Sequence, residues 1–185
     1  DLAVRRLVPK NGLRYLVEAM PYLLARRRAV CYIVGEGPLE AELKGLARER
    51  GVEKEVRFLG GVANRDLPPY FASADVVVVP SLVEATSIAA LEAMSCARPV
   101  AASRVGGLPE IIDETVGTLF EPANPADLAA CAFAGVVPYD EAAPRPSWTS
   151  STGTVADLRF SGYVFTVADP ADPAINSIIP STHPI

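Results

Sequence analysis

The segment that decides the fold of this chain is Ala74-Asp-Val-Val-Val-Val-Pro-Ser81, followed two residues later by Glu84-Ala-Thr-Ser-Ile-Ala-Ala-Leu-Glu-Ala-Met94. Residues 76–79 form a continuous apolar run ended by proline, which is typical of a strand buried on both faces. The second stretch predicts a helix that starts near Thr86, with Leu91 and Met94 on its buried side. A buried strand that leads into a helix is the repeating unit of a parallel α/β fold.

The alternation of strand and helix signals extends in both directions from this unit. Further short apolar runs predict strands at residues 29–34, 56–59, 99–102 and 117–120, with a partial first strand at residues 3–4. Apolar residues recur at helical spacing around residues 13–24 and 39–47. Because crossovers between parallel strands are right-handed, these elements predict an open, doubly wound parallel sheet. Ligands of such sheets bind at the carboxyl ends of the strands.

The turn Gly35-Glu-Gly-Pro38 follows one predicted strand and opens a helix, as a dinucleotide-binding fingerprint would. The third glycine of that fingerprint is absent, because Glu40 occupies its position. The alternative is a tight turn whose glycines take positive φ, with proline in the first helical turn. A phosphate or a base lying against the turn is compatible with either interpretation.

Glu84 and Glu92 lie before and within the predicted helix that starts near Thr86. Both carboxylates would then stand near a helix N-terminus, where the unpaired N–H groups of Thr86, Ser87 and Ile88 can hold a phosphate. Amides for a diphosphate and carboxylates for hydroxyls suit a sugar nucleotide. The alternative is that Glu84 caps the helix and Glu92 lies on a solvated face.

Seven segments occur in an order that resembles the carboxyl-terminal half of retaining GT-B glycosyltransferases of family 4. They are Arg5-Arg-Leu-Val-Pro-Lys-Asn-Gly12, Val34-Gly-Glu-Gly-Pro38, Val56-Arg-Phe-Leu-Gly-Gly61, Ala74 to Ser81, Glu84 to Met94, Arg98-Pro-Val-Ala-Ala-Ser103 and Val105-Gly-Gly-Leu-Pro-Glu110. The resemblance covers about residues 3–133. Its most specific element is the pair of glutamates separated by seven residues.

The resemblance implies a Rossmann-like domain that binds the donor nucleotide of a glycosyltransferase. Such an enzyme moves a hexose from a UDP- or GDP-sugar to an acceptor, here unknown, with retention of configuration and without a metal or other cofactor. It also needs an amino-terminal acceptor domain, which is expected to be missing from this chain. The alternatives are a stand-alone nucleotide-sugar-binding module that is inactive without that domain, and a structural α/β domain that has lost its ligand.

The resemblance also assigns cations to the donor diphosphate. Arg6 matches the family's arginine, whereas Asn11 occupies the position of the family's lysine and Arg5 that of a glycine. Lys10, next to Asn11, is therefore the expected substitute for the lysine. Arg5, Arg6 and Lys10 together form a local cationic cluster where a diphosphate would lie.

The other site residues follow the family pattern. Glu84 matches the glutamate near the donor sugar and phosphate, and Glu92 matches the glutamate that binds the ribose hydroxyls. The donor-binding backbone positions implied by the resemblance are Thr86, Ser87 and Ile88 for the phosphates, Gly61 and Val62 for the base, and Gly35 in the turn after the second strand.

Composition excludes several other classes of function. The 185 residues carry a net charge of −5, so no overall positive field exists to hold a nucleic acid. The single histidine, His183, and the absence of an Asp-x-Asp signature argue against histidine-dependent catalysis and a metal-bound donor. Three cysteines without CxxC spacing predict free thiols and a cytoplasmic location. Contact with a membrane is left open.

The composition changes near Ala134, which predicts two parts, residues 1–133 and residues 134–185. The second part holds seven of the 17 prolines but only two of the 17 basic residues, and it matches nothing in the family pattern. It is irregular or β-prone, for example at residues 162–167, and its role is unknown. A separate β-rich piece, a flexible extension and a shifted reading frame all fit it. Trp148 and residues 163–167 would form a sugar-stacking surface or a small hydrophobic cluster.

Overall fold

A computed structural model describes residues 1–135, 157–160 and 163–166 of the chain. Contacts divide the chain into two compact units, Asp1–Tyr139 and Asp140–Ile185. Among the described residues, no helix combines the length and the apolar character that crossing a bilayer requires.

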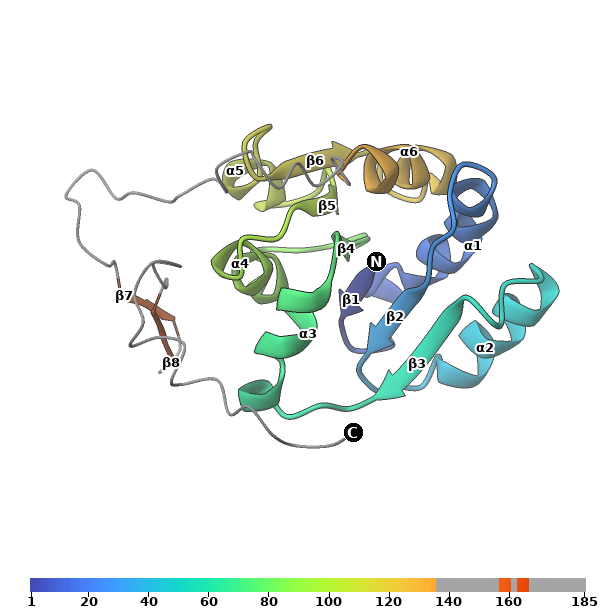
Figure 1. Cartoon of the computed structure of the whole chain (residues 1–185), viewed down its shortest axis with the longest axis horizontal. Helices are drawn as coiled ribbons and strands as arrows, with labels where there is room; N and C mark the ends of the chain where they lie inside the picture. Colours follow the sequence, from blue (N-terminus) through green and yellow to red (C-terminus); the bar gives the residue numbers. More distant parts are fainter. Residues whose placement is uncertain (136–156, 161–162, 167–185) are drawn as a thin grey trace. The chain divides into compact units, whose positions relative to one another are not determined.

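The first unit is built on a parallel sheet of six strands in the order β3-β2-β1-β4-β5-β6 (Figure 1). The strands are β1 Leu2–Val4, β2 Cys31–Val34, β3 Val56–Gly60, β4 Val77–Val79, β5 Val100–Ser103 and β6 Gly117–Phe120. Every pairing in this sheet is parallel. The predicted Rossmann-like, doubly wound sheet is therefore confirmed, and the strand predicted at residues 3–4 is β1, at its centre.

Helices cover both faces of the sheet. They are α1 Leu13–Leu24, α2 Glu40–Glu49, α3 Pro68–Ser73, α4 Ile88–Ser95, α5 Leu108–Ile111 and α6 Pro125–Gly135, with short 3-10 turns η1 Pro9–Asn11 and η2 Asn64–Asp66. One hydrophobic core contains residues of α1, α2 and α6, and a second contains residues of α3, α4 and α5. Strand β4 serves both cores, because Val78 belongs to the first and Val77 and Val79 to the second. Burial on both faces explains the continuous apolar run of this strand.

Helix α4 packs against the sheet through small side chains. Its buried residues are Ala89, Ala90 and Ala93. The expectation that Leu91 and Met94 form its buried side is only partly right: Met94 packs partly buried against the second core, whereas Leu91 is half-buried. Alanines on the inner face allow the helix backbone to approach the sheet closely.

The sheet order reverses between β1 and β4, and the two strands pair at one position only, Leu2 with Val77. Beyond that pair the strands lead into separate loops, as expected for the crevice in which doubly wound folds bind ligands. The two loops meet again outside the strands, where the Leu82 N–H donates a hydrogen bond of 2.8 Å to the Lys10 carbonyl. The loops after β1 and β4 are thus fixed against each other.

The second unit contains two described strands, β7 Asp157–Phe160 and β8 Tyr163–Thr166, which pair antiparallel. Strand β8 falls within the segment predicted to be β-prone. Trp148 and its proposed stacking role lie outside the described residues, as does most of the predicted second part. The stacking role of Trp148 stays a hypothesis, and no role is assigned to the second part.

Candidate functional site

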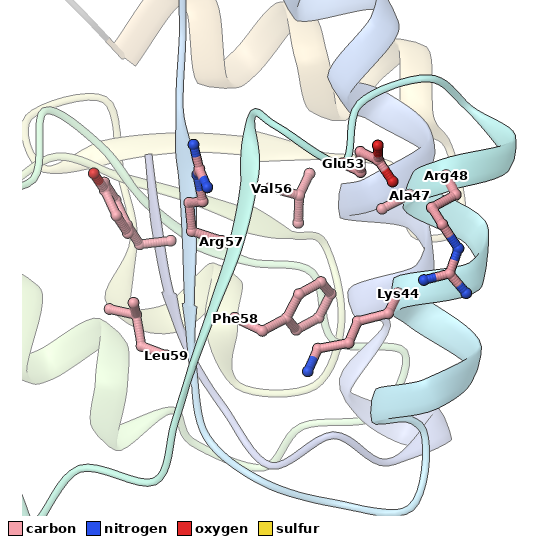
Figure 2. Close-up of a pocket in the computed structure, with 9 residues that line it drawn as sticks. Lys44, Ala47, Arg48, Glu53, Val56, Arg57, Phe58 and Leu59 are labelled. Atoms are coloured by element: carbon pink, nitrogen blue, oxygen red, sulfur yellow. The ribbon is translucent and has the colours of Figure 1, made fainter.

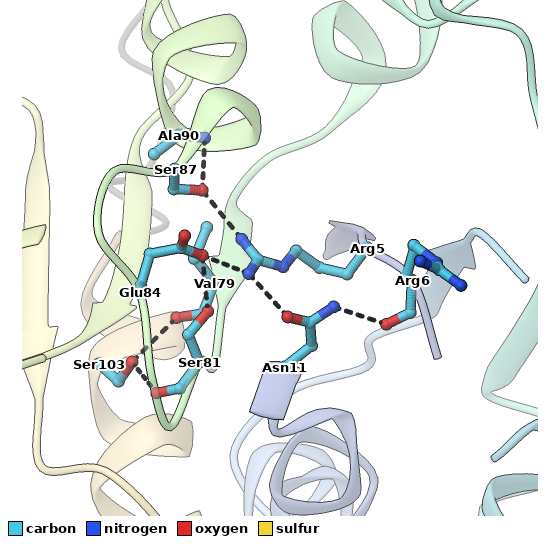
Figure 3. A network of polar contacts seen from close by, with 9 residues as sticks. All are labelled: Arg5, Arg6, Asn11, Val79, Ser81, Glu84, Ser87, Ala90 and Ser103. Carbon is cyan, nitrogen blue, oxygen red and sulfur yellow. Dashed lines mark hydrogen bonds and ion pairs between the residues drawn. The ribbon is translucent and has the colours of Figure 1, made fainter. Parts of the chain in front are cut away.

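A polar network centred on Arg5 crosses the crevice between β1 and β4 (Figure 3). Arg5 follows β1 directly, and its guanidinium donates hydrogen bonds of 3.0 Å from Nη1 to Ser87 Oγ and from Nη2 to Asn11 Oδ1. Nη2 also pairs with Glu84 Oε2. The side chains of Arg5 and Glu84 are only 10% and 15% exposed, so this ion pair is largely shielded from water.

Hydrogen bonds from serines at the ends of β4 and β5 hold the loop that carries Glu84. Ser81 Oγ donates to Glu84 Oε2 at 3.2 Å. Ser103, the last residue of β5, is fully buried and donates its hydroxyl to the Ser81 carbonyl at 2.5 Å. Both serines lie at the carboxyl ends of buried strands, and that position is the signal by which they could have been picked out as site-supporting residues.

Gly106 presses against the backbone of the Glu84 loop. It has φ of +53°, and a Cβ built on it would lie 1.5 Å from the Glu84 carbonyl oxygen. The next residue, Gly107, donates its N–H to the Ala85 carbonyl at 3.2 Å. The glycine pair after β5 therefore fixes where Glu84 stands, a role that the sequence motif alone did not reveal.

Helix α4 starts at the crevice with Ser87 as its N-cap. Ser87 has extended backbone angles, and its Oγ accepts a hydrogen bond of 3.3 Å from the Ala90 N–H. The helix thus begins at Ile88, two residues later than predicted. Within the described part of the chain, no acceptor is found for the N–H groups of Thr86, Ser87 and Ile88. These are the three amides that the sequence predicted as phosphate ligands.

Arg6 faces the other way from Arg5 (Figure 3). It lines an open pocket of about 490 Å³ together with Glu36, Gly37 and Gly61. Glu36 Oε1 accepts a hydrogen bond of 3.2 Å from the Gly61 N–H, which ties the ends of β2 and β3 together. The structure therefore brings the predicted residues Arg6 and Gly61 into one pocket, and it is Arg5 that reaches Glu84.

The Gly35–Pro38 turn packs against the backbone of the segment that carries both arginines. Gly35 has φ of +139°, and a Cβ there would lie 2.0 Å from the Arg5 carbonyl oxygen. The Leu7 N–H donates to the Glu36 carbonyl at 2.9 Å, so the turn is bonded to the segment after β1. The tight-turn interpretation accounts for Gly35. Two other parts of that interpretation were wrong: Gly37 does not have a positive φ, and Pro38 precedes the helix, because α2 begins only at Glu40.

The remaining predicted residues lie around this centre in different settings. Glu92, in the second turn of α4, is half-buried, and burial raises the pKa of its carboxyl above the ordinary value. No hydrogen bond from another described residue reaches that carboxylate. Lys10 has an exposed side chain and serves the loop through its carbonyl group. Val62 is half-buried and packs against the second core.

A second pocket, of about 520 Å³, lies between α2 and the edge strand β3 (Figure 2). Lys44, Arg48 and Arg57 supply positive charge there, and Lys44 Nζ lies 5.7 Å from the centroid of the Phe58 ring. None of the predicted site residues lines this pocket. It is also formed along the side of the strands, away from the crevice where the sheet order reverses.

Comparison with known proteins gives a family match over the first unit. The family described as glycosyl transferases group 1 matches residues 2–134. A glycosyltransferase of Methanocaldococcus jannaschii without an assigned activity is 44% identical over 129 residues, which cover 69% of this chain. A GDP-mannose-dependent α-(1-6)-phosphatidylinositol monomannoside mannosyltransferase of Mycolicibacterium smegmatis is 37% identical over 65% of this chain. The chain spans about a third of each relative, 33% and 34%.

A solved structure shows the same fold with a nucleotide sugar bound. HepE from Anabaena, crystallised in complex with UDP-glucose, superposes with a TM-score of 0.65 at 28% sequence identity. The superposition covers 72% of this chain and 38% of HepE. The sheet and its surrounding helices thus correspond to part of a larger protein.

Proposed function

The chain belongs to the glycosyl transferases of group 1, and from this premise we propose that it is the donor-binding part of a retaining glycosyltransferase. The enzyme would move a hexose from a UDP- or GDP-sugar to an acceptor that is still to be identified. The chain spans about a third of its relatives, so the complete activity is proposed to require an additional amino-terminal acceptor domain, as the family resemblance implies.

One observation carries this proposal: the network of Arg5, Glu84 and Ser87 at the point where the sheet order reverses. A guanidinium, a carboxylate and the free amides at the start of α4 come together in one crevice. A nucleoside-diphosphate sugar needs cations and N–H donors for its phosphates and carboxylates for its hydroxyls. Few other classes of ligand would use a guanidinium, a carboxylate and helix amides together at the point where the sheet order reverses.

The proposed roles of the cations follow from the position of the diphosphate. Arg6, from the neighbouring pocket, would neutralise the charge that develops on the leaving nucleoside diphosphate. Lys10 is the candidate for a second cation on sequence grounds. The amides of Thr86, Ser87 and Ile88 would bind the phosphate oxygens, an arrangement that the helix dipole favours.

The proposed roles of the carboxylates and of the base pocket rest on burial and position. Glu84 would accept hydrogen bonds from the donor sugar. Glu92 would bind the ribose, and its half-buried carboxyl, without a described partner, can accept from two vicinal hydroxyls. Gly61 and Val62, with Gly35 in the turn beside them, would lie against the base.

Transfer would proceed with retention, by departure of the nucleoside diphosphate from the face on which the acceptor hydroxyl attacks. The bond between the anomeric carbon and the phosphate oxygen breaks with its electron pair on oxygen, and that oxygen takes up the acceptor proton. Arginine and helix amides would carry the leaving-group charge without a metal ion. EDTA in the assay is therefore expected to leave transfer unchanged.

The two donor bases are both supported by relatives. The Mycolicibacterium smegmatis enzyme is named for its dependence on GDP-mannose, and the Anabaena structure contains UDP-glucose. A stand-alone nucleotide-sugar-binding module is the second candidate, and donor hydrolysis or transfer by the isolated chain would contradict it. A cytoplasmic location is proposed on the basis of the three free cysteines.

A thermal-unfolding panel with UDP, GDP and ADP and their sugars tests the proposal. We expect at least one nucleoside diphosphate to raise Tm, because a ligand that binds only the native state stabilises it. Arg6→Ala and Glu92→Ala are each expected to remove the shift, whereas Lys54→Met, which deletes an exposed charge outside the site, is a matched control. A shift that survives both site substitutions would contradict the assignment of the site.

A further inference from the structure

Arg5 and Arg6 are neighbours in sequence that face opposite sides of the β1 end (Figure 3). Successive residues of an extended segment alternate between two sides. Arg6 accordingly lines the pocket with Gly61, whereas Arg5 reaches Glu84 and Ser87. The cation nearest to the start of α4 is therefore Arg5.

We propose that Arg5, held by Asn11, is the second cation that binds the donor diphosphate, in place of Lys10. The inference rests on the function proposed above and gives Arg5, one member of the predicted cationic cluster, the role of second cation that the sequence pattern gave to Lys10. It follows from where the guanidinium lies, between the Glu84 carboxylate and the N-cap of α4.

The hydrogen bonds of Arg5 leave it able to bind an anion. A guanidinium carries five N–H donors, and Ser87, Asn11 and Glu84 engage three of them. The Nε–H and one N–H of Nη1 have no partner among the described residues and remain for phosphate oxygens. Because the side chain is only 10% exposed, its charge is screened by water far less than that of a surface cation.

Glu84 makes a cation at this place necessary. A diphosphate bound at the amides of α4 would bring further negative charge next to the Glu84 carboxylate. Arg5 lies against that carboxylate and so offsets the repulsion between the two anions. Lys10, whose side chain is exposed and has no hydrogen bond or ion pair among the described residues, does not stand between them.

Asn11, in η1, contacts the Arg5 guanidinium, so a side chain at position 11 can reach the place that this guanidinium occupies. Its Oδ1 accepts from Arg5 at 3.0 Å, and its Nδ2 donates to the Arg6 carbonyl at 2.7 Å, so the buried amide fixes the direction of the guanidinium. A lysine at position 11 would extend its ammonium toward the position that Arg5 now occupies. The site then needs one cation there, whichever of the two residues supplies it.

Calorimetric binding of UDP and GDP to the full chain tests this inference. Arg5→Met is expected to weaken the affinity for the bound nucleotide by about 10- to 100-fold, the usual effect of losing hydrogen bonds to a charged group. Arg5→Lys, which keeps the charge and loses the fork, should lose less. The double variant Arg5→Met/Asn11→Lys should recover at least part of the affinity, and Lys54→Met is the matched charge-loss control.

The outcomes separate the inference from the proposed function. A wild-type chain that binds no nucleoside diphosphate sinks the proposed function, and this inference with it. A wild-type chain that binds, together with a folded Arg5→Met variant of equal or higher affinity, overturns the role of Arg5 alone. A Lys10→Met variant that loses as much as Arg5→Met also overturns it. A folded double variant without recovery would show that Arg5 acts through packing and not through its charge, which equally contradicts the proposal.

Discussion

The crevice between β1 and β4 and the pocket between α2 and β3 both gather positive charge, yet they are built differently. In the crevice, Arg5 is largely buried and is bonded to three side chains from two other segments of the chain, Asn11 in η1 and the loop that carries Glu84 and Ser87. In the α2–β3 pocket, Lys44 is 46% exposed and pairs with Glu40 one turn away on the same helix. Positive charge alone therefore distinguishes the candidate site less well than side chains that the fold holds in place.

Glycine substitutions with positive φ should show the largest difference between the two regions. Gly106→Ala adds a Cβ that would overlap the Glu84 carbonyl oxygen, whereas Gly51→Ala, beside α2, adds one with nothing within 4 Å. Both variants carry the backbone strain of about 1–2 kcal/mol for an L-residue in the left-handed region. We expect Gly106→Ala to cost roughly 3 kcal/mol or more in total, since strain and steric overlap add. Urea denaturation measures the free energy of unfolding of both variants. An equal loss in the two would show that the Glu84 loop shifts to accommodate the added Cβ without further cost.

Removing one charge from each region's ion pair should give the next largest difference. Glu84→Gln leaves Arg5 largely buried without its counter-charge, and we expect a loss of about 3 kcal/mol in the free energy of unfolding. Glu40→Gln breaks the exposed pair with Lys44 and should cost at most about 0.5 kcal/mol. A Glu84→Gln variant as stable as wild type would mean that the crevice pair is no better fixed than the surface pair.

The smallest effect concerns Glu92, whose carboxyl is half-buried. Because burial raises the pKa of this group in the native state, the unfolded chain loses the proton first as pH rises above the ordinary value of 4.5. Ionisation of Glu92 therefore lowers stability as pH rises from there through the raised native pKa. Glu92→Gln should remove this dependence, so that its stability relative to wild type increases with pH across that interval. Denaturation curves at several pH values measure it, and a constant difference would contradict the burial of this carboxylate.

Much of the fold could be predicted because strands of a parallel sheet are buried on both faces. Such strands must be apolar, and the runs at residues 76–79 and 99–102 show this directly. The inner face of α4 could not be predicted in the same way. Leu91 and Met94 are more hydrophobic than the alanines beside them, but the closeness of the helix to the sheet, which depends on both partners, selects Ala89, Ala90 and Ala93 for the buried side.

The candidate site shows the same division between local and long-range information. The amides at the start of α4 and the position of Glu84 followed from one continuous stretch of sequence. The residues that hold Glu84 in place could not be found in this way. Ser103 ends β5 and Gly106 follows it, and both reach the Glu84 loop only because β4 pairs with β5. No local pattern records a contact between residues that lie some 20 positions apart.

The sequence by itself determined the order of the strands in the chain, the helices α1, α2 and α4, the doubly wound sheet and the segments from which a nucleotide site would be built. These depend on hydrophobic periodicity and on short motifs, which are local properties of the chain. Only the tertiary structure decided which arginine faces Glu84, because that depends on the direction in which the chain leaves β1 and on Asn11 and Ser87 arriving from other elements. Partners from other elements hold the guanidinium in place, and for that reason the pairing of Arg5 with Glu84 emerged only from the folded chain.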